Sequence, residues 1–418
     1  MTIVELIEDK KKKKKLSKKQ IDFFINGLMD NTIPDYQISA LLMAIWFNGL
    51  DDNELFFLTS AMVNSGNTYN FHSNYRKVLI DKHSTGGVGD KVSIVLVPML
   101  ACFGVGVCKI SGRGLGFTGG TIDKLESIGM NTNVSIDQAK SFLEKNDMFI
   151  ISQTKDIVPA DKILYALRDV TGTVDSMPLI AASVLSKKIA LESDYIFIDI
   201  KYGEGAFCKN FIGARKLSAI INKLAKKFKR KVYSVLSDTN NVIGRSIGNA
   251  VEVREAVSYL KGDEVEENFK SLVDSLIVLI ALKTKICKSE SEVREKIKKI
   301  IDEKLAFQRF CDWVEMQGGN VGKIRNDTFF HPKYQFILRA NKSGILTYKS
   351  VLDLADLSVD LGSGRKTKTD VIDYQAGIYL HTTNRSCVKK NGKVMTLYSS
   401  NSIVPDLIER AKKIFKIN

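Results

Sequence analysis

The chain has 418 residues, of which 44% are hydrophobic and 26% charged, a composition typical of folded globular proteins and not of disordered chains. Its 62 Lys and Arg residues against 47 Asp and Glu give a formal charge of +15, which raises the question of a nucleic-acid or membrane partner. The longest apolar stretch, residues 94–108, is interrupted by Pro98 and two glycines and is shorter than the roughly 20 residues that cross a bilayer. We therefore expect no membrane span.

The N-terminal sequence, the cysteines and the histidines argue against a secreted, a disulfide-bonded and a His-based metal protein. The N-terminus, MTIVELIEDK, has acidic residues and no apolar segment, so no secretory signal is expected and the predicted location is cytoplasmic. The six cysteines are scattered and form no CxxC pair, which is typical of reduced thiols. The histidines at 72, 83, 331 and 381 are too far apart in the sequence to predict a metal cluster.

The first 66 residues are predicted to be helical. Apolar residues recur at helical spacing over 21–28, 38–45 and 55–62, and Asp51 or Asp52 can cap the third of these helices. No strand pattern interrupts this block. It is expected to form a helical lobe.

From residue 77 onward, predicted strands alternate with helices, a pattern typical of a sheet with crossover connections. The strands are predicted at 78–81, 105–110, 149–151, 195–200 and 232–236. Residues 161–189 are predicted to be helical and could rejoin the helical lobe, helices dominate 246–317, and the last 75 residues or so have strand-and-turn character. The predicted class is α/β, with a helical lobe, a larger mixed α/β lobe and a strand-rich C-terminal subdomain. The predicted boundaries are 1–66 and 156–192 for the helical lobe, 67–155 and 193–340 for the α/β lobe, and 341–418 for the C-terminal subdomain.

A glycine-rich loop follows the first predicted strand, in the segment DKHSTGGVGD at 81–90. Glycines let backbone N–H groups approach an anion, and the N-terminus of the next helix adds positive potential. Lys82, Ser84 and Ser93 supply a charge and donors of the kind that a phosphate needs. A single loop of this type could equally be an ordinary strand-to-helix turn.

The next predicted strand has the same arrangement, in KISGRGLGFTGGTIDKLE at 109–126. Two such loops after neighbouring strands are expected to lie side by side at the carboxyl edge of the sheet, where open α/β folds bind ligands. Neither loop has the spacing of a P-loop or of the dinucleotide fingerprint. The pair therefore predicts a different kind of anion site.

A third cluster contains Arg168, Ser183 and Lys187 in the helical stretch. Taken alone, these residues would be solvated helix charges. They become relevant to binding only if the helical lobe faces the glycine-rich loops.

Long segments of the chain resemble the thymidine and pyrimidine-nucleoside phosphorylases. They are DKHSTGGVGD (81–90), SGRGLGFTGGTIDKLES (111–127), PADKILYALRDVTGTVDSMPLIAASVLSKKIA (159–190), GEGAF (203–207), GNAVEVREA (248–256), NGLMDNTIPDYQISALLMAIWF near the N-terminus and VDLGSGRK…IDYQAGIYLH near the C-terminus. The resemblance covers nearly the whole chain. It implies reversible phosphorolysis, in which a pyrimidine nucleoside and phosphate give the free base and a pentose 1-phosphate.

The resemblance also assigns roles to individual residues. The implied phosphate ligands are Lys82, Ser84, Ser93, Lys109, Ser111 and Thr121. The groups implied to hold the base are Arg168, Ser183 and Lys187. His83 is implied to hydrogen-bond or protonate the base oxygen at position 2, which makes His83, Arg168 and Lys187 the expected catalytic residues.

The resemblance further implies a homodimer whose lobes close about hinges near 66–76, 153–160 and 190–194. No organic cofactor is expected. Some family members bind a potassium-like ion, and the matching positions here are Gly89, Lys91, Ile243, Ser246 and Glu255. Lys91 stands where some relatives have Thr, which argues against the ion, and Glu255 could have a structural role alone.

Lys109 bears on specificity within the family. Thymidine-restricted relatives resemble this segment with Met at that position, whereas the broad pyrimidine-nucleoside enzymes have Lys, so cleavage of uridine, deoxyuridine and thymidine is predicted. Phe117 replaces the usual His and is interpreted as loop packing.

Alternatives are a thymidine-restricted enzyme, an enzyme like anthranilate phosphoribosyltransferase and a nucleic-acid binder. The last lacks any recognition motif, so neither nucleic acid nor membrane is a predicted partner. The run Lys10–Lys15 is interpreted as a surface connection. Arg113 and Lys188 are the further basic residues that could face the anion site.

Overall fold

The structure, a computed structural model, describes residues 1–73, 75–114, 119–367 and 370–418. Contacts between residues divide the chain into two compact units. Unit 1 comprises residues 1–83, 153–198 and 212–234, and unit 2 comprises 84–152, 199–211 and 235–418. The chain thus combines a helical N-terminal domain with an α/β domain and a strand-rich C-terminal region.

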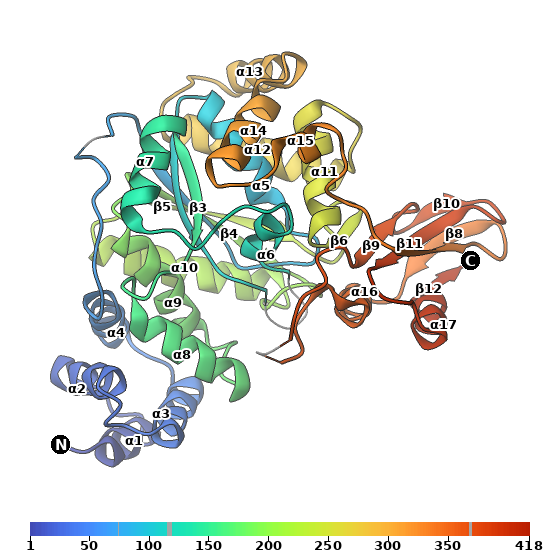
Figure 1. Cartoon of the computed structure of the whole chain (residues 1–418). Coiled ribbons are helices and arrows are strands. Elements are labelled where there is room, and N and C mark those ends of the chain that lie inside the picture. Colours follow the sequence, from blue (N-terminus) through green and yellow to red (C-terminus); the bar gives the residue numbers. More distant parts are fainter. Residues whose placement is uncertain (74, 115–118, 368–369) are drawn as a thin grey trace. The chain divides into compact units, whose positions relative to one another are not determined.

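Unit 1 is built mainly from helices, which gather together in Figure 1. They are α1 (Ile3–Lys11), α2 (Lys18–Met29), α3 (Asp35–Asn48), α4 (Asp52–Asn64), α8 (Pro159–Val170), α9 (Met177–Ala190) and α10 (Phe211–Lys227). The three helices predicted in the first 66 residues are confirmed as α2, α3 and α4, and Asp51 is the N-cap of α4. α8 packs against α2, α3 and α4, and α9 packs against α4.

The interpretation of the whole Lys10–Lys15 run as a surface connection is wrong at its first residue. Lys10 belongs to α1, is 3% exposed, and places its Nζ 2.7 Å from Glu54 Oε1. Glu54 completes the capping box of α4 and also accepts a hydrogen bond from the backbone N–H of Leu16 at 2.8 Å. A charged residue is therefore buried here because a cap carboxylate compensates its charge.

A five-stranded sheet has the strand order β3-β2-β1-β4-β5. Its strands are β1 (Leu79–Ser84), β2 (Gly106–Ser111), β3 (Met148–Ser152), β4 (Tyr195–Tyr202) and β5 (Val232–Asp238). All five strands were predicted. β2 and β3 run parallel, with Lys109 opposite Ile150.

Unit 2 is organised around α5 (Val92–Cys102), every residue of which from Val92 to Ala101 is buried. A helix that is apolar on all sides needs cover on all sides, and α11, α12 and α14 pack against it. The other helices of unit 2 up to residue 325 are α6 (Thr121–Glu126), α7 (Ile136–Asn146), α11 (Ala250–Lys261), α12 (Glu267–Lys283), α13 (Glu290–Asp302), α14 (Leu305–Met316) and α15 (Val321–Arg325).

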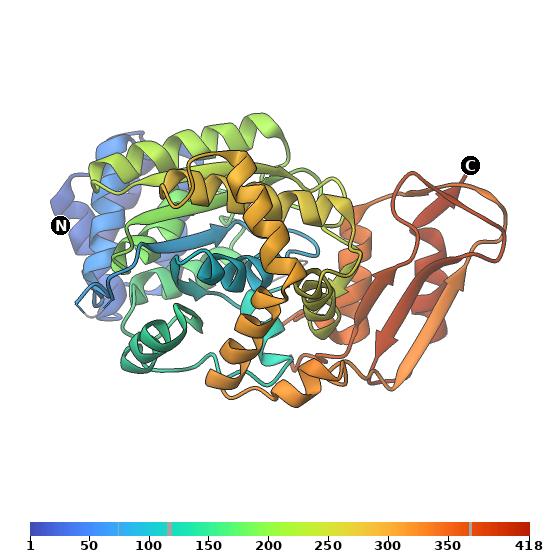
Figure 2. The ribbon, with the colours of Figure 1, turned by 90° about the horizontal axis from the view of Figure 1, so that it is seen from above.

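The C-terminal region contains two small sheets, with strand orders β10-β8-β12 and β6-β9-β11-β7. Apart from β6, whose residues have a yellow colour, the strands lie at one end of unit 2, in orange and red in Figure 2. They are β6 (Ser246–Gly248), β7 (Tyr334–Arg339), β8 (Gly344–Tyr348), β9 (Gly377–Leu380), β10 (Ser386–Val388), β11 (Lys393–Ser399) and β12 (Phe415–Ile417). Residues 341–418 were predicted to be a strand-rich α/β subdomain, and the strands are accompanied by two helices. These are α16 (Val351–Ser358), which continues into the π-helical turn η1 (Val359–Ser363), and α17 (Pro405–Lys413). Within the described residues, no helix is long and apolar enough to cross a membrane.

Candidate active site

The first glycine-rich loop of unit 2 is closed by its own side chains. The Ser84 hydroxyl donates to Asp90 Oδ2 at 2.5 Å and accepts the N–H of Gly86 at 3.3 Å. Gly86 and Gly89 have φ angles of 86° and 79°, which a residue with a Cβ adopts only with strain. The glycines that predicted an anion loop are therefore required by the backbone conformation.

The loop leads directly into α5. Lys91 is the N-cap of this helix, and Ser93, in its first turn, is 5% exposed. The first backbone N–H groups of a helix have no intrahelical partner and favour an anion. Ser93 thus lies where a phosphate ligand is expected.

A buried network that the sequence reasoning did not identify supports the same loop. The N–H of Thr85 donates to the carbonyl of Asp199, and the Thr85 hydroxyl accepts the N–H of Lys201 at 2.8 Å. The Lys201 ammonium lies 2.6 Å from the Asp199 carboxylate, and both side chains are fully buried. The only signal in the sequence is a charged pair inside the apolar strand IFIDIK.

The second glycine-rich segment also belongs to unit 2. Lys109 and Ser111 lie on β2, with Lys109 only 3% exposed, and Thr121 begins α6. The described part of the loop is tied by Asp123, which accepts the N–H of Gly114 at 2.6 Å. Phe117 lies outside the described residues.

Arg113 is held by carboxylates, contrary to the expectation that it faces the anion site. Its guanidinium donates to both oxygens of Glu126, at 2.5 and 2.7 Å, and to Asp123 at 3.3 Å. Arg365 also reaches Asp123, at 3.0 Å. These contacts fix the base of the loop.

The two loops approach each other within unit 2. Gly89 of the first and Gly119 of the second line one pocket, together with Gly248 and Glu252. This agrees with the expected side-by-side placement of the loops. Glycines at 89, 119, 248 and 364 contribute to the lining of the pocket, so backbone groups are accessible there without a side chain in between.

Lys82 and His83 lie on β1 and belong to unit 1. The Lys82 side chain is fully buried, whereas His83 is partly buried. A lysine in the middle of a buried strand is unusual unless it meets a compensating charge or a ligand.

Arg168, at the end of α8, points back to the α8–α9 connection. Its Nε, Nη1 and Nη2 atoms donate to the carbonyls of Thr173, Leu179 and Val174, at 3.2, 3.1 and 2.6 Å. The side chain is 3% exposed, and burial lowers the pKa of Arg168. Three of its five donors are thus engaged in holding the connection between the two helices.

Lys187 and Ser183 lie four residues apart on α9, so they share one face of the helix. Lys187 Nζ lies 3.1 Å from Ser183 Oγ and forms a short ion pair with Asp161 of α8. Burial lowers the pKa of Lys187, and the Asp161 carboxylate partly offsets this effect. Sequence reasoning did not identify Asp161, although it stands in the quoted PADKILYALRD motif.

Lys188 was expected to face the anion site, but its ammonium forms an ion pair with a buried aspartate instead. Its Nζ lies 2.9 Å from Asp81 Oδ1, and neither side chain is more than 1% exposed. The structure therefore gathers Arg168, Ser183 and Lys187 on α8 and α9 of unit 1, and Ser84, Ser93, Lys109, Ser111 and Thr121 in unit 2.

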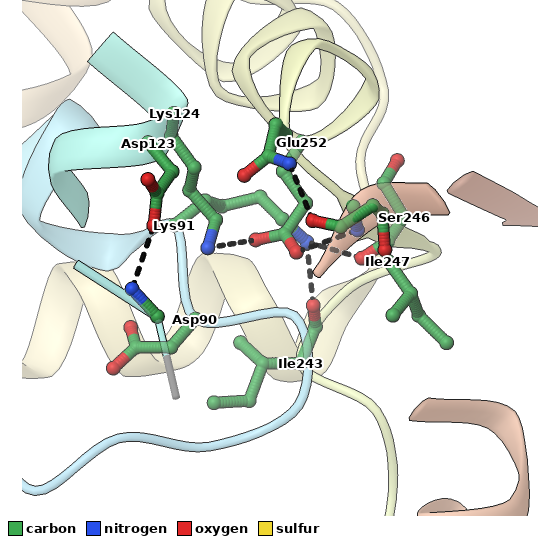
Figure 3. A network of polar contacts seen from close by, with 12 residues as sticks. Asp90, Lys91, Asp123, Lys124, Ile243, Ser246, Ile247 and Glu252 are labelled. Carbon is green, nitrogen blue, oxygen red and sulfur yellow. Dashed lines mark hydrogen bonds and ion pairs between the residues drawn. The ribbon is translucent and has the colours of Figure 1, made fainter. Parts of the chain in front are cut away.

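The positions predicted for a potassium-like ion do not fit such an ion. The Lys91 ammonium itself lies among the oxygen atoms of Ile243, Ser246 and Glu255. Figure 3 shows Lys91 beside Ile243 and Ser246. Among the described residues, no group of three or more His, Cys, Asp and Glu side chains could hold a metal ion.

The helical domain, the α/β domain and the glycine-rich loops define a glycosyltransferase fold. Residues 4–66 match the helical bundle domain of the glycosyl transferase family, and residues 76–306 match its a/b domain. The fold is similar to that of anthranilate phosphoribosyltransferase from Thermus thermophilus, with a TM-score of 0.59 and 15% identity over 75% of this chain and 99% of that one.

The C-terminal region narrows this class. Residues 345–418 match the pyrimidine nucleoside phosphorylase C-terminal domain. A thymidine phosphorylase of Mycoplasmoides pirum is 62% identical over the full length of both chains, and a pyrimidine-nucleoside phosphorylase of Bacillus subtilis is 40% identical over 98% of this chain and 95% of its own. The chain belongs to the thymidine and pyrimidine-nucleoside phosphorylase family.

Proposed function

We propose that this protein is a pentosyltransferase that catalyses the reversible phosphorolysis of uridine, deoxyuridine and thymidine to the free base and the (deoxy)ribose 1-phosphate. The observation that carries the proposal is the cluster of Lys187, Ser183 and Asp161 on two neighbouring helices. It presents a partly buried cation and a hydroxyl, which are the groups that a pyrimidine base needs when it leaves as an anion.

The chemistry follows from the charges that develop in the reaction. Breaking the glycosidic bond builds positive charge on the sugar and negative charge on the departing base. Arg168, Lys187 and a protonated His83 are proposed to stabilise the base as that charge forms, which is binding stronger in the transition state than in the substrate. Phosphate is the nucleophile, so the mechanism needs no covalent bond to the protein.

The phosphate is proposed to bind to Lys82, Ser84, Ser93, Lys109, Ser111 and Thr121. Its negative charge would also stabilise the cationic sugar. This assignment is supported by the positive-φ glycines of the first loop, by the start of α5 beside Ser93, and by the buried ammonium of Lys109. Each feature favours an anion over a neutral ligand.

Two observations favour different substrate ranges. Lys109 matches the broad enzymes of the family, and its ammonium could reach both phosphate and a ribose hydroxyl. Against this, the relative at 62% identity is named a thymidine phosphorylase, whereas those near 40% are named pyrimidine-nucleoside phosphorylases. We propose the broader range because the Lys109 side chain provides a direct physical reason for it.

The test is an absorbance assay of the purified protein with uridine, deoxyuridine or thymidine, with and without phosphate. The expected result is release of base from all three nucleosides, only when phosphate is present. Thymidine cleavage with inert uridine would establish the thymidine-restricted alternative. If none of the three nucleosides were cleaved, the proposal of a phosphorylase would be refuted.

A homodimer is also proposed, on the resemblance to the family. Light scattering coupled to gel filtration tests it directly. A mass near twice the 46.7 kDa of the chain is expected, and a single-chain mass would exclude the dimer.

A further inference from the structure

The Lys91 ammonium occupies a cage of oxygen atoms inside unit 2. Its Nζ lies 2.6 Å from the carbonyl oxygen of Ile243, 2.7 Å from Glu255 Oε2 and 3.4 Å from the carbonyl oxygen of Ser246. The Lys91 side chain is fully buried. An ammonium group has three N–H donors, so these three oxygens match its donor capacity.

The cage is tightly packed around this ammonium. A Cβ at Gly244 would lie 2.7 Å from Lys91 Nζ and 2.5 Å from Glu255 Oε1. A Cβ at Gly89 would lie 2.7 Å from the Ile243 carbonyl oxygen and 3.0 Å from that of Ser246. The Phe269 ring closes another side, with its centroid 5.1 Å from Nζ. An additional ion has no space beside Nζ without displacing it.

The charges are also balanced without an ion. Glu255 compensates Lys91 and accepts the backbone N–H groups of Arg245 and Ser246, at 2.8 and 2.9 Å. The neighbouring buried pair, Lys124 and Glu252, is neutral as a unit, with 3.4 Å between Nζ and Oε2 (Figure 3). A further buried cation would add an uncompensated positive charge, which is strongly disfavoured.

We propose that the Lys91 ammonium is a covalently attached substitute for a monovalent cation, so that this protein needs no potassium-like ion. Gly89, Ile243, Ser246 and Glu255 then remain as a cage for a group that the chain itself supplies. One atom of the cage is left over: the buried Ser246 hydroxyl has no hydrogen-bond partner among the described residues. A single hydroxyl does not hold an ion against the charge of Lys91.

Lys91 also connects the first glycine-rich loop to the rest of unit 2. The N–H of Lys91 donates to the Gly89 carbonyl at 2.9 Å, and the N–H of Ile243 donates to the Val88 carbonyl at 3.1 Å. The ammonium therefore joins the loop to the start of β6 and to α11, which carries Glu255. If the loop binds phosphate, a consequence that rests on the proposed function, loss of the ammonium should weaken phosphate binding.

The first test needs no activity. Thermal unfolding of the full chain is measured in potassium chloride and in N-methylglucamine chloride at equal ionic strength. The wild-type midpoint is expected to be the same in both salts. Lys91→Thr, which removes the ammonium and supplies a hydroxyl, is expected to melt lower in N-methylglucamine and to regain part of the loss in potassium. A potassium-specific rise in the wild-type midpoint would overturn the proposal, even if the variant failed to fold.

Lys10→Thr is the matched control, because it also removes a buried ammonium from a buried glutamate, Glu54. It is expected to melt lower in both salts alike, since in the described part of the chain the Lys10 ammonium donates to Glu54 and to no carbonyl oxygen. If potassium raised the midpoints of both variants equally, the effect would be a general response to an unpaired carboxylate, and the assignment of a cation cage would fall.

The second test uses phosphate kinetics. Without potassium, Lys91→Thr is expected to raise the KM for phosphate by about 10–100-fold, the usual effect of losing a group that orients ligands, and potassium is expected to reverse most of this rise. A KM for phosphate that stays at the wild-type value in the variant without potassium would overturn the link to the loop. A wild-type protein that cleaves no nucleoside would refute the proposed function. The unfolding test would still show whether the Lys91 ammonium takes the place of a monovalent cation.

Discussion

Lys188 Nζ lies 2.9 Å from Asp81 Oδ1, in a pair of side chains that are at most 1% exposed. Asp81 immediately precedes Lys82 and His83 on β1, and Lys188 immediately follows Lys187 on α9. A single ion pair therefore connects the strand that carries two of the proposed ligands to the helix that carries a third. We therefore expect Lys188 to act through these neighbours, as a positioning residue.

Lys188→Met should lower the free energy of unfolding by about 3–5 kcal/mol, because a buried carboxylate loses its ion-pair partner. The double variant Lys188→Met with Asp81→Asn should recover a substantial part of the loss, since it removes the charge that lost its partner. Urea denaturation followed by circular dichroism measures both. Additive losses in the double variant would show that the pair is not coupled.

Lys298→Ala provides the surface comparison for this experiment. Lys298 forms an ion pair with Asp302 at 2.8 Å, but the two side chains are 79% and 59% exposed. Exposed pairs of this kind contribute about 0–1 kcal/mol. If Lys298→Ala lowered the free energy of unfolding as much as Lys188→Met, burial would not explain the larger effect expected for Lys188.

Arg168 should be sensitive even to a conservative change. Arg168→Lys keeps a positive charge but cannot donate to the carbonyls of Thr173, Val174 and Leu179 at once, because an ammonium lacks the planar fork of the guanidinium. We expect kcat/KM to fall by about 10²–10³-fold in Arg168→Ala and to stay well below wild type in Arg168→Lys. Near-normal turnover in Arg168→Ala would remove this residue from the mechanism.

Lys109 can be tested by its effect on the choice of sugar. Lys109→Met removes a buried charge and keeps a side chain of similar length. We expect the ratio of kcat/KM for uridine to kcat/KM for thymidine to fall by at least about tenfold, because a hydrogen bond from a charged group is lost. Lys145→Met, at an exposed position on α7, serves as the control and should leave the ratio unchanged. An equal loss with both nucleosides would assign Lys109 to phosphate alone.

The sequence predicted the elements that depend on local pattern. A cap at Asp51 or Asp52, five apolar strands and a glycine-rich loop at 81–90 were predicted. The structure has Asp51 as the cap, the five strands of the large sheet, and positive φ angles at Gly86 and Gly89 in the loop. These features depend on residues close together in the chain, so periodicity and turn chemistry are sufficient to find them.

Contacts between distant residues could not be found in this way. Lys10, Lys91 and Lys188 are each buried beside a carboxylate 44, 164 and 107 residues away, respectively. Composition predicts that lysines are exposed, and nothing in the local sequence identifies the partner. For the same reason Asp161 was not identified, although it stands 26 residues before its partner Lys187.

The pH dependence of turnover should report the state of Lys187. Burial lowers the pKa of its ammonium from the usual 10.5, and the proposed role requires the charged form. We therefore expect kcat/KM to decline on the alkaline side at a pH below 10.5. Unfolding cannot cause this decline through Lys187: between the lowered folded pKa and 10.5 the unfolded chain binds more protons, so this group makes the folded state relatively more stable as pH rises.

Two variants separate this explanation from the titration of another group. Lys187→Arg should shift the alkaline decline to higher pH, whatever its effect on the maximum rate, because a guanidinium stays protonated beyond pH 12. Asp161→Asn should shift the decline to lower pH, since the Asp161 carboxylate is the group that raises the pKa of Lys187 against the effect of burial. Lys162→Ala, an exposed neighbour on α8, should leave the profile unchanged. A decline that stays at the same pH in Lys187→Arg would show that a different residue titrates, and the assignment of Lys187 as the cation at the base would then have to be abandoned.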